Sequence, residues 1–222
     1  GTSETNSMTF YAVGAGTGLE NLVAYKGTDD GYEFFGGTVS GKNLVSYGNY
    51  DDSFDWQDSW SGQSNSNWFA FQTAIGNFGM EIESSGNADN TAPKINNITL
   101  IRETGTKPET AGSIEITAIQ FKKHGSGIFS NVYMDGYKNT DSKNAYAVLI
   151  QDSATETEQV NKGKIKVEPA NHVNSDNLNV WGYAFTPNGG KTFTSDSNVK
   201  KVTLTTGNWA NVNGVDLLAA LK

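Results

Sequence analysis

The sequence has no cysteine, a single arginine (Arg102) and no long apolar run. Without cysteine the chain can form no disulfide, no thiolate metal site and no cysteine nucleophile. A membrane-spanning helix needs about 20 consecutive apolar residues, so we expect none here. Binding to nucleic acid requires clustered Lys and Arg. The net charge of −8 therefore argues against nucleic acid and anionic lipid as partners.

Glycine and aromatic residues are abundant instead: the chain has 25 Gly, 5 Trp, 9 Tyr and 11 Phe. Turn-forming residues separate short segments that are rich in aromatic and β-branched residues. Such segments are typical of β-strands joined by turns. The composition predicts an all-β protein with minimal helix, built as an antiparallel β-sandwich of the jelly-roll or immunoglobulin-like kind. The expected strands are Met8–Val13, Leu22–Tyr25, Tyr32–Phe35, Asn43–Tyr47, Trp68–Thr73, Gly79–Glu83, Ile95–Arg102, Ser113–Lys122, Val132–Tyr137, Ala145–Gln151, Lys164–Glu168, Leu178–Phe185 and Lys200–Thr205.

A polar stretch with Gly and Pro at residues 105–112 has no hydrophobic periodicity and is the best candidate for a linker. It divides the chain into two expected sandwich modules, residues 1–104 and 113–222. One large jelly roll over residues 8–222 is the alternative. No strong internal repeat is evident, and residues 215–221 are the one helix-like segment. The Asn, Gly and Ser content favours a secreted or cell-surface protein.

The most unusual stretch is Tyr47–Trp68, where aromatic rings stand among Asp, Asn, Ser and Gln instead of aliphatic residues. Such a mixture suits a surface that stacks on a sugar ring and hydrogen-bonds its hydroxyl groups. The stacking candidates are Trp56, Trp60 and Trp68, with Tyr50 as a weaker addition, and the polar partners are Asp55, Asp58 and Gln63. The alternative for each tryptophan is an ordinary place in the core.

A second aromatic face is expected in Leu178–Phe185. Side chains in a strand alternate between its two faces, so Trp181 and Tyr183 share one face. This face is either a second platform for a glycan or a packing surface between sheets.

The acidic residues allow two further hypotheses. The aspartates at positions 51, 52, 55 and 58 could hold a structural calcium ion, which prefers oxygen ligands, although a solvated acidic loop is the default and no cofactor is predicted. Glycoside hydrolysis needs two carboxylates about 5–10 Å apart. Glu81 and Glu83 share a strand face that Asp55 or Asp58 could oppose. The usual sandwich-hydrolase signatures are absent, and we predict that the protein is not an enzyme.

The aromatic and acid-amide loop Tyr47–Trp68, together with strands such as Asn96–Arg102, resembles the β-sandwich carbohydrate-binding modules of bacterial polysaccharide-degrading and cell-surface glycan-binding proteins. The resemblance implies non-catalytic binding of a polysaccharide such as starch or a plant cell-wall glucan, within a larger multidomain protein. A structural or adhesive surface domain of the surface-layer, pilus or phage receptor-binding type and a jelly-roll glycanase are the alternatives.

Overall fold

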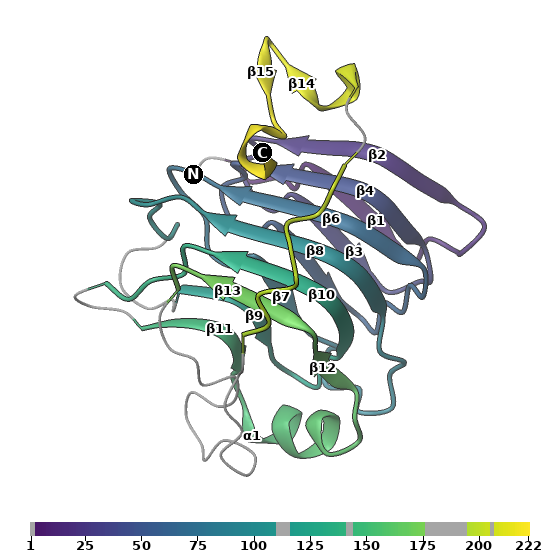
Figure 1. Cartoon of the computed structure of the whole chain (residues 1–222). Coiled ribbons are helices and arrows are strands. Elements are labelled where there is room, and N and C mark those ends of the chain that lie inside the picture. Colours follow the sequence, from purple (N-terminus) through teal and green to yellow (C-terminus); the bar gives the residue numbers. More distant parts are fainter. Residues whose placement is uncertain (1–2, 110–115, 141–143, 176–194, 205–206) are drawn as a thin grey trace.

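The structure, a computed structural model, describes residues 3–109, 116–140, 144–175, 195–204 and 207–222. Its described strands form two large parallel sheets, one of odd-numbered strands and one of even-numbered strands together with β13, so that the chain passes from one sheet to the other and back (Figure 1). This is the arrangement of a parallel β-helix, in which each strand stacks on a strand of the preceding coil.

The six-stranded odd sheet runs β1-β3-β5-β7-β9-β11, and the even sheet runs β12-β10-β8-β6-β4-β2 with β13 also paired to β10. The odd strands are β1 Met8–Tyr11, β3 Tyr32–Phe35, β5 Phe54–Gln57, β7 Met80–Ile82, β9 Ile116–Phe121 and β11 Ala145–Ile150. The even sheet holds β2 Gly18–Tyr25, β4 Ser40–Tyr47, β6 Asn65–Gln72, β8 Lys94–Arg102, β10 Gly127–Asp135, β12 Ile165–Val167 and β13 Ala170–Val173.

We call one odd strand together with the even strand that follows it a rung. Successive segments near the start of the chain are close copies in sequence: Asn21–Phe35 and Asn43–Gln57 align position by position, including Asn-Leu-Val and Asp-Asp pairs. Tyr32 pairs with Phe54 and Leu22 with Leu44, a shift of 22 residues in both sheets. A repeat of this length is the signature of a solenoid.

An asparagine in each of the first four even strands bends the strand. Asn21, Asn43, Asn67 and Asn97 have φ between 56° and 61°, a left-handed conformation that Asn tolerates better than most residues. Their side chains form a ladder along the stack: each amide Nδ2 donates to the Oδ1 of the preceding asparagine at 2.8, 2.9 and 3.1 Å. In the next rung Asn131 donates to Asn96. The ladder satisfies the polar groups at the bend.

The core lies between the two sheets and is strongly aromatic. Inward residues alternate with outward ones along each strand, and rings at equivalent positions of neighbouring rungs stack, as in Phe10–Phe34 and Tyr32–Phe54 with centroids 5.1 and 5.2 Å apart. Trp68 stacks on Phe54 at 4.6 Å from the opposite sheet. The two sheets are therefore joined through ring contacts.

The C-terminal part of the chain crosses the outer face of the even sheet and ends in a small antiparallel hairpin of β14 Asn211–Val212 and β15 Val215–Asp216 (Figure 1, yellow). Short 3₁₀ turns lie at Asn208–Ala210 and Ala219–Leu221. Its residues Val202, Leu204 and Leu217 form a second apolar cluster with Val45 and Phe69 of the sheet. This segment covers apolar side chains that would otherwise face water.

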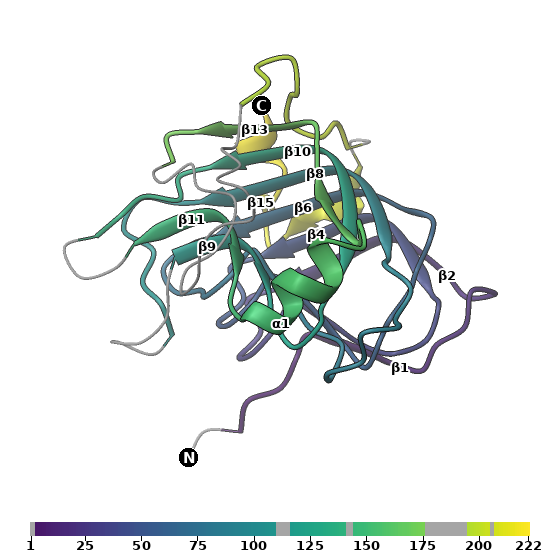
Figure 2. The same ribbon diagram turned by 90° about the horizontal axis from the view of Figure 1, so that it is seen from below.

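A short helical segment follows β11. It begins as α1 Ser153–Thr155 and continues as a π-helical turn, Glu156–Val160, before the chain enters β12 (Figure 2). Val160 packs against the main core, and Gln159 donates a hydrogen bond to the Ala88 carbonyl. The segment thus ties the later rungs to the connection between β7 and β8.

The fold corrects several predictions. The chain is all-β, but the antiparallel sandwich is wrong because every strand pair in the two large sheets is parallel. Neither the modules 1–104 and 113–222 nor the jelly roll over 8–222 is found: β7 pairs with β9 and β8 with β10, so both sheets continue past residues 105–112. Residues 215–221 form a strand and a 3₁₀ turn rather than a regular helix.

Candidate functional site

The outer face of the odd sheet carries a column of acidic side chains. Glu33, Asp55 and Glu81 each stand between two inward core residues of β3, β5 and β7, so they point outward. The backbone register places Glu33 beside Asp55 and Asp55 beside Glu81. Neighbouring strands are about 4.8 Å apart, which forces the three carboxyl groups together.

Aspartates from the turns before β3 and β5 join this column. Asp30 Oδ1 accepts a hydrogen bond from the Asp52 backbone N–H at 3.0 Å, and Asp52 Oδ1 accepts one from the Phe78 N–H at 2.7 Å. Each carboxylate therefore fixes the turn of the next rung. The same side chains also bring further carboxyl groups to the outer face.

We call Asp30, Glu33, Asp52, Asp55 and Glu81 the acidic cluster. Carboxylate oxygens lie within 4.8 Å of one another in two groups, Asp30–Glu33–Asp55 and Asp52–Asp55–Glu81, so Asp55 belongs to both. Asp55 is 7% exposed, and its buried Oδ1 has no hydrogen-bond donor among the described residues. A buried acceptor without a donor is costly and marks Asp55 as the centre of the site.

Burial and mutual repulsion raise the pKa of several members of the cluster. Desolvation, followed by the charge of Asp51, raises the pKa of Asp30 to about 8. The pKa values of Asp52 and Asp55 lie well above the ordinary value of 3.8, mainly because of burial and then because of neighbouring carboxylates. Burial also raises the pKa of Glu33. A raised pKa favours the protonated form of a carboxyl group.

Two lysines lie along one side of the acidic cluster. Lys122 Nζ lies 2.6 Å from Glu81 and 3.8 Å from Glu83, and Lys123 Nζ lies 2.7 Å from Glu83. Burial lowers the pKa of Lys122, but Glu81 and Glu83 outweigh this and raise it overall. Lys122 thus places a cation beside Glu81 at this end of the cluster.

An uncharged column runs beside the acids, two residues further along the strands. Tyr11 pairs with Phe35 and Phe35 with Gln57. The Tyr11 and Phe35 rings lie 5.3 Å apart, and Tyr11 is 73% exposed, the highest value among the large apolar side chains that the structure describes. Gln57 Nε2 donates to Glu33 Oε1 at 2.7 Å and so connects the two columns.

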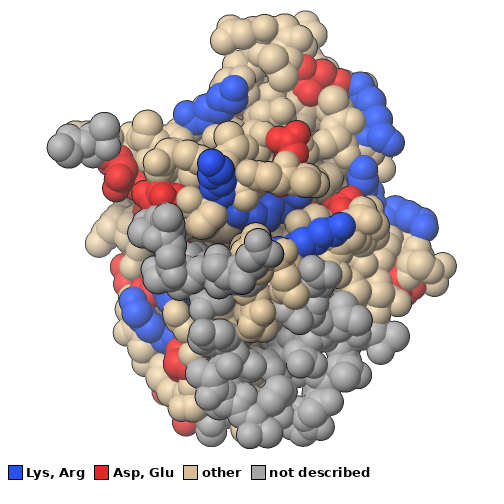
Figure 3. Space-filling model, turned by 90° about the vertical axis from the view of Figure 1, so that its left-hand side faces the viewer, with Lys and Arg blue, Asp and Glu red and all other residues tan. Residues whose placement is uncertain are grey.

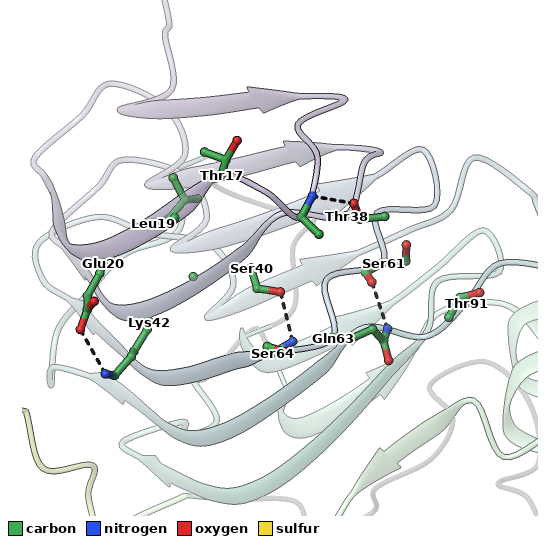
Figure 4. A pocket seen from close by; sticks show the side chains of 13 residues that line it. Thr17, Leu19, Glu20, Thr38, Ser40, Lys42, Ser61, Gln63, Ser64 and Thr91 are labelled. Carbon is green, nitrogen blue, oxygen red and sulfur yellow. Dashed lines mark hydrogen bonds and ion pairs between the residues drawn. The ribbon is translucent and has the colours of Figure 1, made fainter.

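A separate groove of about 500 Å³ lies outside β2 and β4 (Figure 4). Its described lining is rich in hydroxyl groups and contains no aromatic ring. Ser40 Oγ accepts a hydrogen bond from the Ser64 N–H, and Lys42 pairs with Glu20 at 3.1 Å. Gln63, one of the predicted ligand residues, lies here and donates to the Ser61 and Ala92 carbonyls. The acids of the odd sheet do not line this groove, so it offers no comparable chemistry.

The three tryptophans predicted to stack on a sugar are core residues. Trp56, Trp60 and Trp68 are 1%, 1% and 0% exposed. Trp60 Nε1 donates to the Val39 carbonyl and Trp68 Nε1 to the Gly41 carbonyl, both at 3.0 Å. These rings cannot lie on a glycan, and the sequence argument for binding through Tyr47–Trp68 fails.

The other predicted site residues are dispersed. Asp55 lies in the acidic cluster, whereas Asp58 is exposed and accepts a hydrogen bond from Ser85 Oγ at 2.6 Å. Tyr50 is 38% exposed in the turn before β5. Trp181 and Tyr183 lie outside the described residues. Of the aspartates considered for calcium, Asp51 and Asp52 join groups of close carboxylates with Asp30 and Asp55 respectively.

Sequence reasoning missed Glu33, Asp30, Lys122, Tyr11 and Phe35. The signal that could have found the acids is the 22-residue repeat, since it places Asp30 over Asp52 and Glu33 over Asp55. On the side of the molecule shown in Figure 3, basic and acidic side chains are interspersed, which offers no continuous basic surface there.

A family model described as a pectate-lyase-like β-helix domain matches residues 1–216 of the 222. No curated protein and no solved structure matched the chain. The resemblance to β-sandwich carbohydrate-binding modules is therefore wrong, and so is the prediction that the protein is no enzyme, because the family description points to a lyase-like domain. In the part of the chain that the structure describes, no helix has the length and apolarity to cross a bilayer.

Proposed function

Because the chain belongs to the pectate-lyase-like β-helix family, we propose that it cleaves glycosidic bonds of a polysaccharide at the acidic cluster. Family membership makes the protein a polysaccharide-related one. The observation that supports cleavage is the placement of Asp55 beside Glu81, the first with a raised pKa and the second ion-paired to Lys122.

Paired carboxyl groups in unlike environments are the working parts of most glycoside hydrolases. Asp55 is buried among acids, which favours its protonated form, so it serves as the general acid. Glu81 forms an ion pair with Lys122 at 2.6 Å and serves as the carboxylate partner. Oxygens of the two groups lie within 4.8 Å, close to the ~5 Å separation of enzymes that retain anomeric configuration.

The proposed reaction has two steps. Asp55 gives its proton to the glycosidic oxygen as the bond from that oxygen to the anomeric carbon breaks, and Glu81 forms a bond to the same carbon. Water then attacks this carbon, the bond to Glu81 breaks, and Asp55 accepts a proton from the water. One water molecule is consumed for each bond cleaved, and both carboxyl groups return to their starting states.

The test is release of reducing ends from a panel of polysaccharides. We expect Asp55→Asn and Glu81→Gln each to lower kcat by roughly 10²–10⁴-fold, the usual contribution of a positioned acid or base. Asp58→Asn is the matched control, because Asp58 lies three residues beyond Asp55 and outside the acidic cluster. Cleavage that survives both substitutions, or no cleavage of any polymer by the unaltered protein, would overturn the proposal.

A second candidate is cation-dependent elimination from a uronate chain. The all-oxygen ligand groups around Asp55 fit a hard cation such as calcium. Elimination also requires a base to remove a proton from the sugar. Among the described residues, Lys122 is engaged by Glu81, and the Arg102 guanidinium is used by the Gly76 and Asn77 carbonyls. An unsaturated, ultraviolet-absorbing product that disappears on adding EDTA would favour this candidate over hydrolysis.

We also propose that the protein acts outside the cell, either secreted or held at the surface, because a polymeric substrate does not cross a membrane. Antibody labelling of intact cells tests this. Full protection of the protein from an external protease would count against it.

A further inference from the structure

We propose that the acidic cluster selects polysaccharides that carry no carboxylate or sulfate groups, so that the substrate is an uncharged glycan. This inference rests on the proposed function and adds the chemical class of the substrate. It departs from what the family description alone would lead one to expect.

The first argument is the balance of charge on this face. Within the described residues, Lys122 and Lys123 are the cations that form ion pairs on this face of the odd sheet. Both are already paired with Glu81 or Glu83, so neither is left to pair with a charged sugar. A sugar carboxylate entering beside Asp55 would meet Glu33 and Glu81 on the two neighbouring strands. Like charges at such distances repel strongly where water is excluded.

The second argument is hydrogen bonding. The buried Asp55 Oδ1 has no donor among the described residues and lies in both groups of close carboxylates. Sugar hydroxyl groups donate hydrogen bonds, whereas ionised carboxylates and sulfates only accept them. Of the groups that a polysaccharide carries, hydroxyl groups can donate a hydrogen bond to this oxygen, whereas ionised carboxylates and sulfates cannot.

The third argument is the neighbouring column. Tyr11, Phe35 and Gln57 lie along the acids and present aromatic rings and an amide without formal charge. Apolar C–H groups of a sugar pack on rings, and its hydroxyl groups pair with amides. The uncharged column beside the acidic cluster thus matches the surface of an uncharged polysaccharide.

Matched polymers test the inference directly. Affinity electrophoresis of the Asp55→Asn protein with EDTA would compare a glucan and a mannan with the same polymers after oxidation of their primary hydroxyl groups to carboxylates. Methyl-esterified homogalacturonan and its de-esterified form make a third pair. We expect at least one uncharged polymer to bind, with affinity falling ~10-fold or more in its acidic form. Equal or tighter binding of the acidic form, or binding of an acidic form once calcium is added, would overturn the inference.

Glu33 provides the variant test, because it lies one strand from Asp55 and takes no part in the proposed chemistry. Glu33→Lys should narrow the difference between uncharged and acidic polymers, and the more conservative Glu33→Gln should do so partially. Glu20→Lys makes the same charge change on the even sheet, away from the acidic cluster, and should leave the difference unchanged. An equal effect of Glu33→Lys and Glu20→Lys would assign selectivity to net charge alone and contradict the inference.

The two proposals fail separately. If an uncharged polymer binds through this face but no reducing ends form, the inference stands and catalysis fails. If acidic polymers are cleaved faster than their uncharged counterparts and Asp55→Asn abolishes cleavage, catalysis stands and the inference fails.

Discussion

Three indole rings fill the space between the two sheets in the third rung. Trp56 lies 5.2 Å from Trp60 and 6.5 Å from Trp68, and Trp60 lies 6.1 Å from Trp68. Two of the three indole N–H groups are satisfied by backbone carbonyls of the preceding rung. The rings therefore combine apolar burial with hydrogen bonds that fix the connection between rungs.

Truncation of Trp68 tests this structural role. We expect Trp68→Ala to lower the free energy of unfolding by about 3–5 kcal/mol, because it removes a large buried side chain. Trp68→Phe loses mainly the bond to the Gly41 carbonyl and should cost less. Urea denaturation measures both. Tyr11→Ala, at an exposed ring, is the control and should change stability little.

Aspartates with raised pKa values predict stability that falls as the pH rises. In the folded protein the pKa of Asp30 is about 8 and that of Asp51 about 6, against an ordinary value of 3.8. The folded state therefore binds more protons than the unfolded state between these values. The stabilising contribution is complete below pH ~4 and is lost as the pH rises through the folded pKa values.

Thermal unfolding between pH 5 and pH 8 checks this dependence. The melting temperature should fall across this range, and Asp30→Asn should flatten the fall because an amide does not titrate. A melting temperature that rises with pH, or a slope that Asp30→Asn leaves unaltered, would contradict the assignment of protons to this turn.

At the scale of elements, the sequence predicts where strands lie in the chain better than it predicts which strands pair with one another. The segments Tyr32–Phe35 and Ala145–Gln151 were located within a residue, because short apolar and aromatic runs between turn residues are local signals. Strand β5 was missed since its Phe-Asp-Trp-Gln sequence lies within a highly polar stretch. Parallel pairing depends on residues 22 or more positions apart, so only the unnoticed repeat could have revealed it.

The candidate site was predictable only in part for the same reason. The sequence offers Asp55 and Glu81 as candidate carboxylates, but nothing within its own strand sets Glu33 apart. Glu33 becomes a candidate site residue only because Asp55 lies beside it on the next strand of the sheet. Residues of a solenoid face acquire their chemistry from register, not from neighbours in the chain.

The asparagine ladder makes a prediction of its own. Asn43→Ala removes two ladder hydrogen bonds and places an alanine at φ 56°, so we expect a loss of roughly 1–3 kcal/mol. Asn43→Gly relieves the backbone strain and should cost less. Asn213→Ala shares the left-handed φ, 51°, at an exposed turn outside the ladder. Equal losses for Asn43→Ala and Asn213→Ala in denaturation would show that the ladder contributes nothing.

For the whole molecule, stacking implies stability that depends on neighbours. A rung contacts only the rungs beside it, and β1 and β2 each pair with one strand whereas β4, β6 and β8 pair with two. End rungs of such arrays open more readily than central ones.

Hydrogen exchange read by mass spectrometry tests this gradient. Amides of β1 and β2 should exchange at least ~10-fold faster than those of β6 and β8, where even a 1.4 kcal/mol difference in opening free energy gives that ratio. The inner strand β4 should lie closer to β6 than to β2. Uniform protection from β2 to β8 would instead indicate one cooperative unit.

The spacing between stacked residues is uneven along the solenoid. Tyr32 pairs with Phe54, 22 positions later, whereas Met80 pairs with Ile119, 39 positions later, although both pairs belong to one sheet. Stacking constrains the strands and leaves the connections free to lengthen. Insertions and deletions among relatives should consequently collect at the connections between strands. There they can change the loops around the outer face of the odd sheet without moving the strands that carry the acidic cluster.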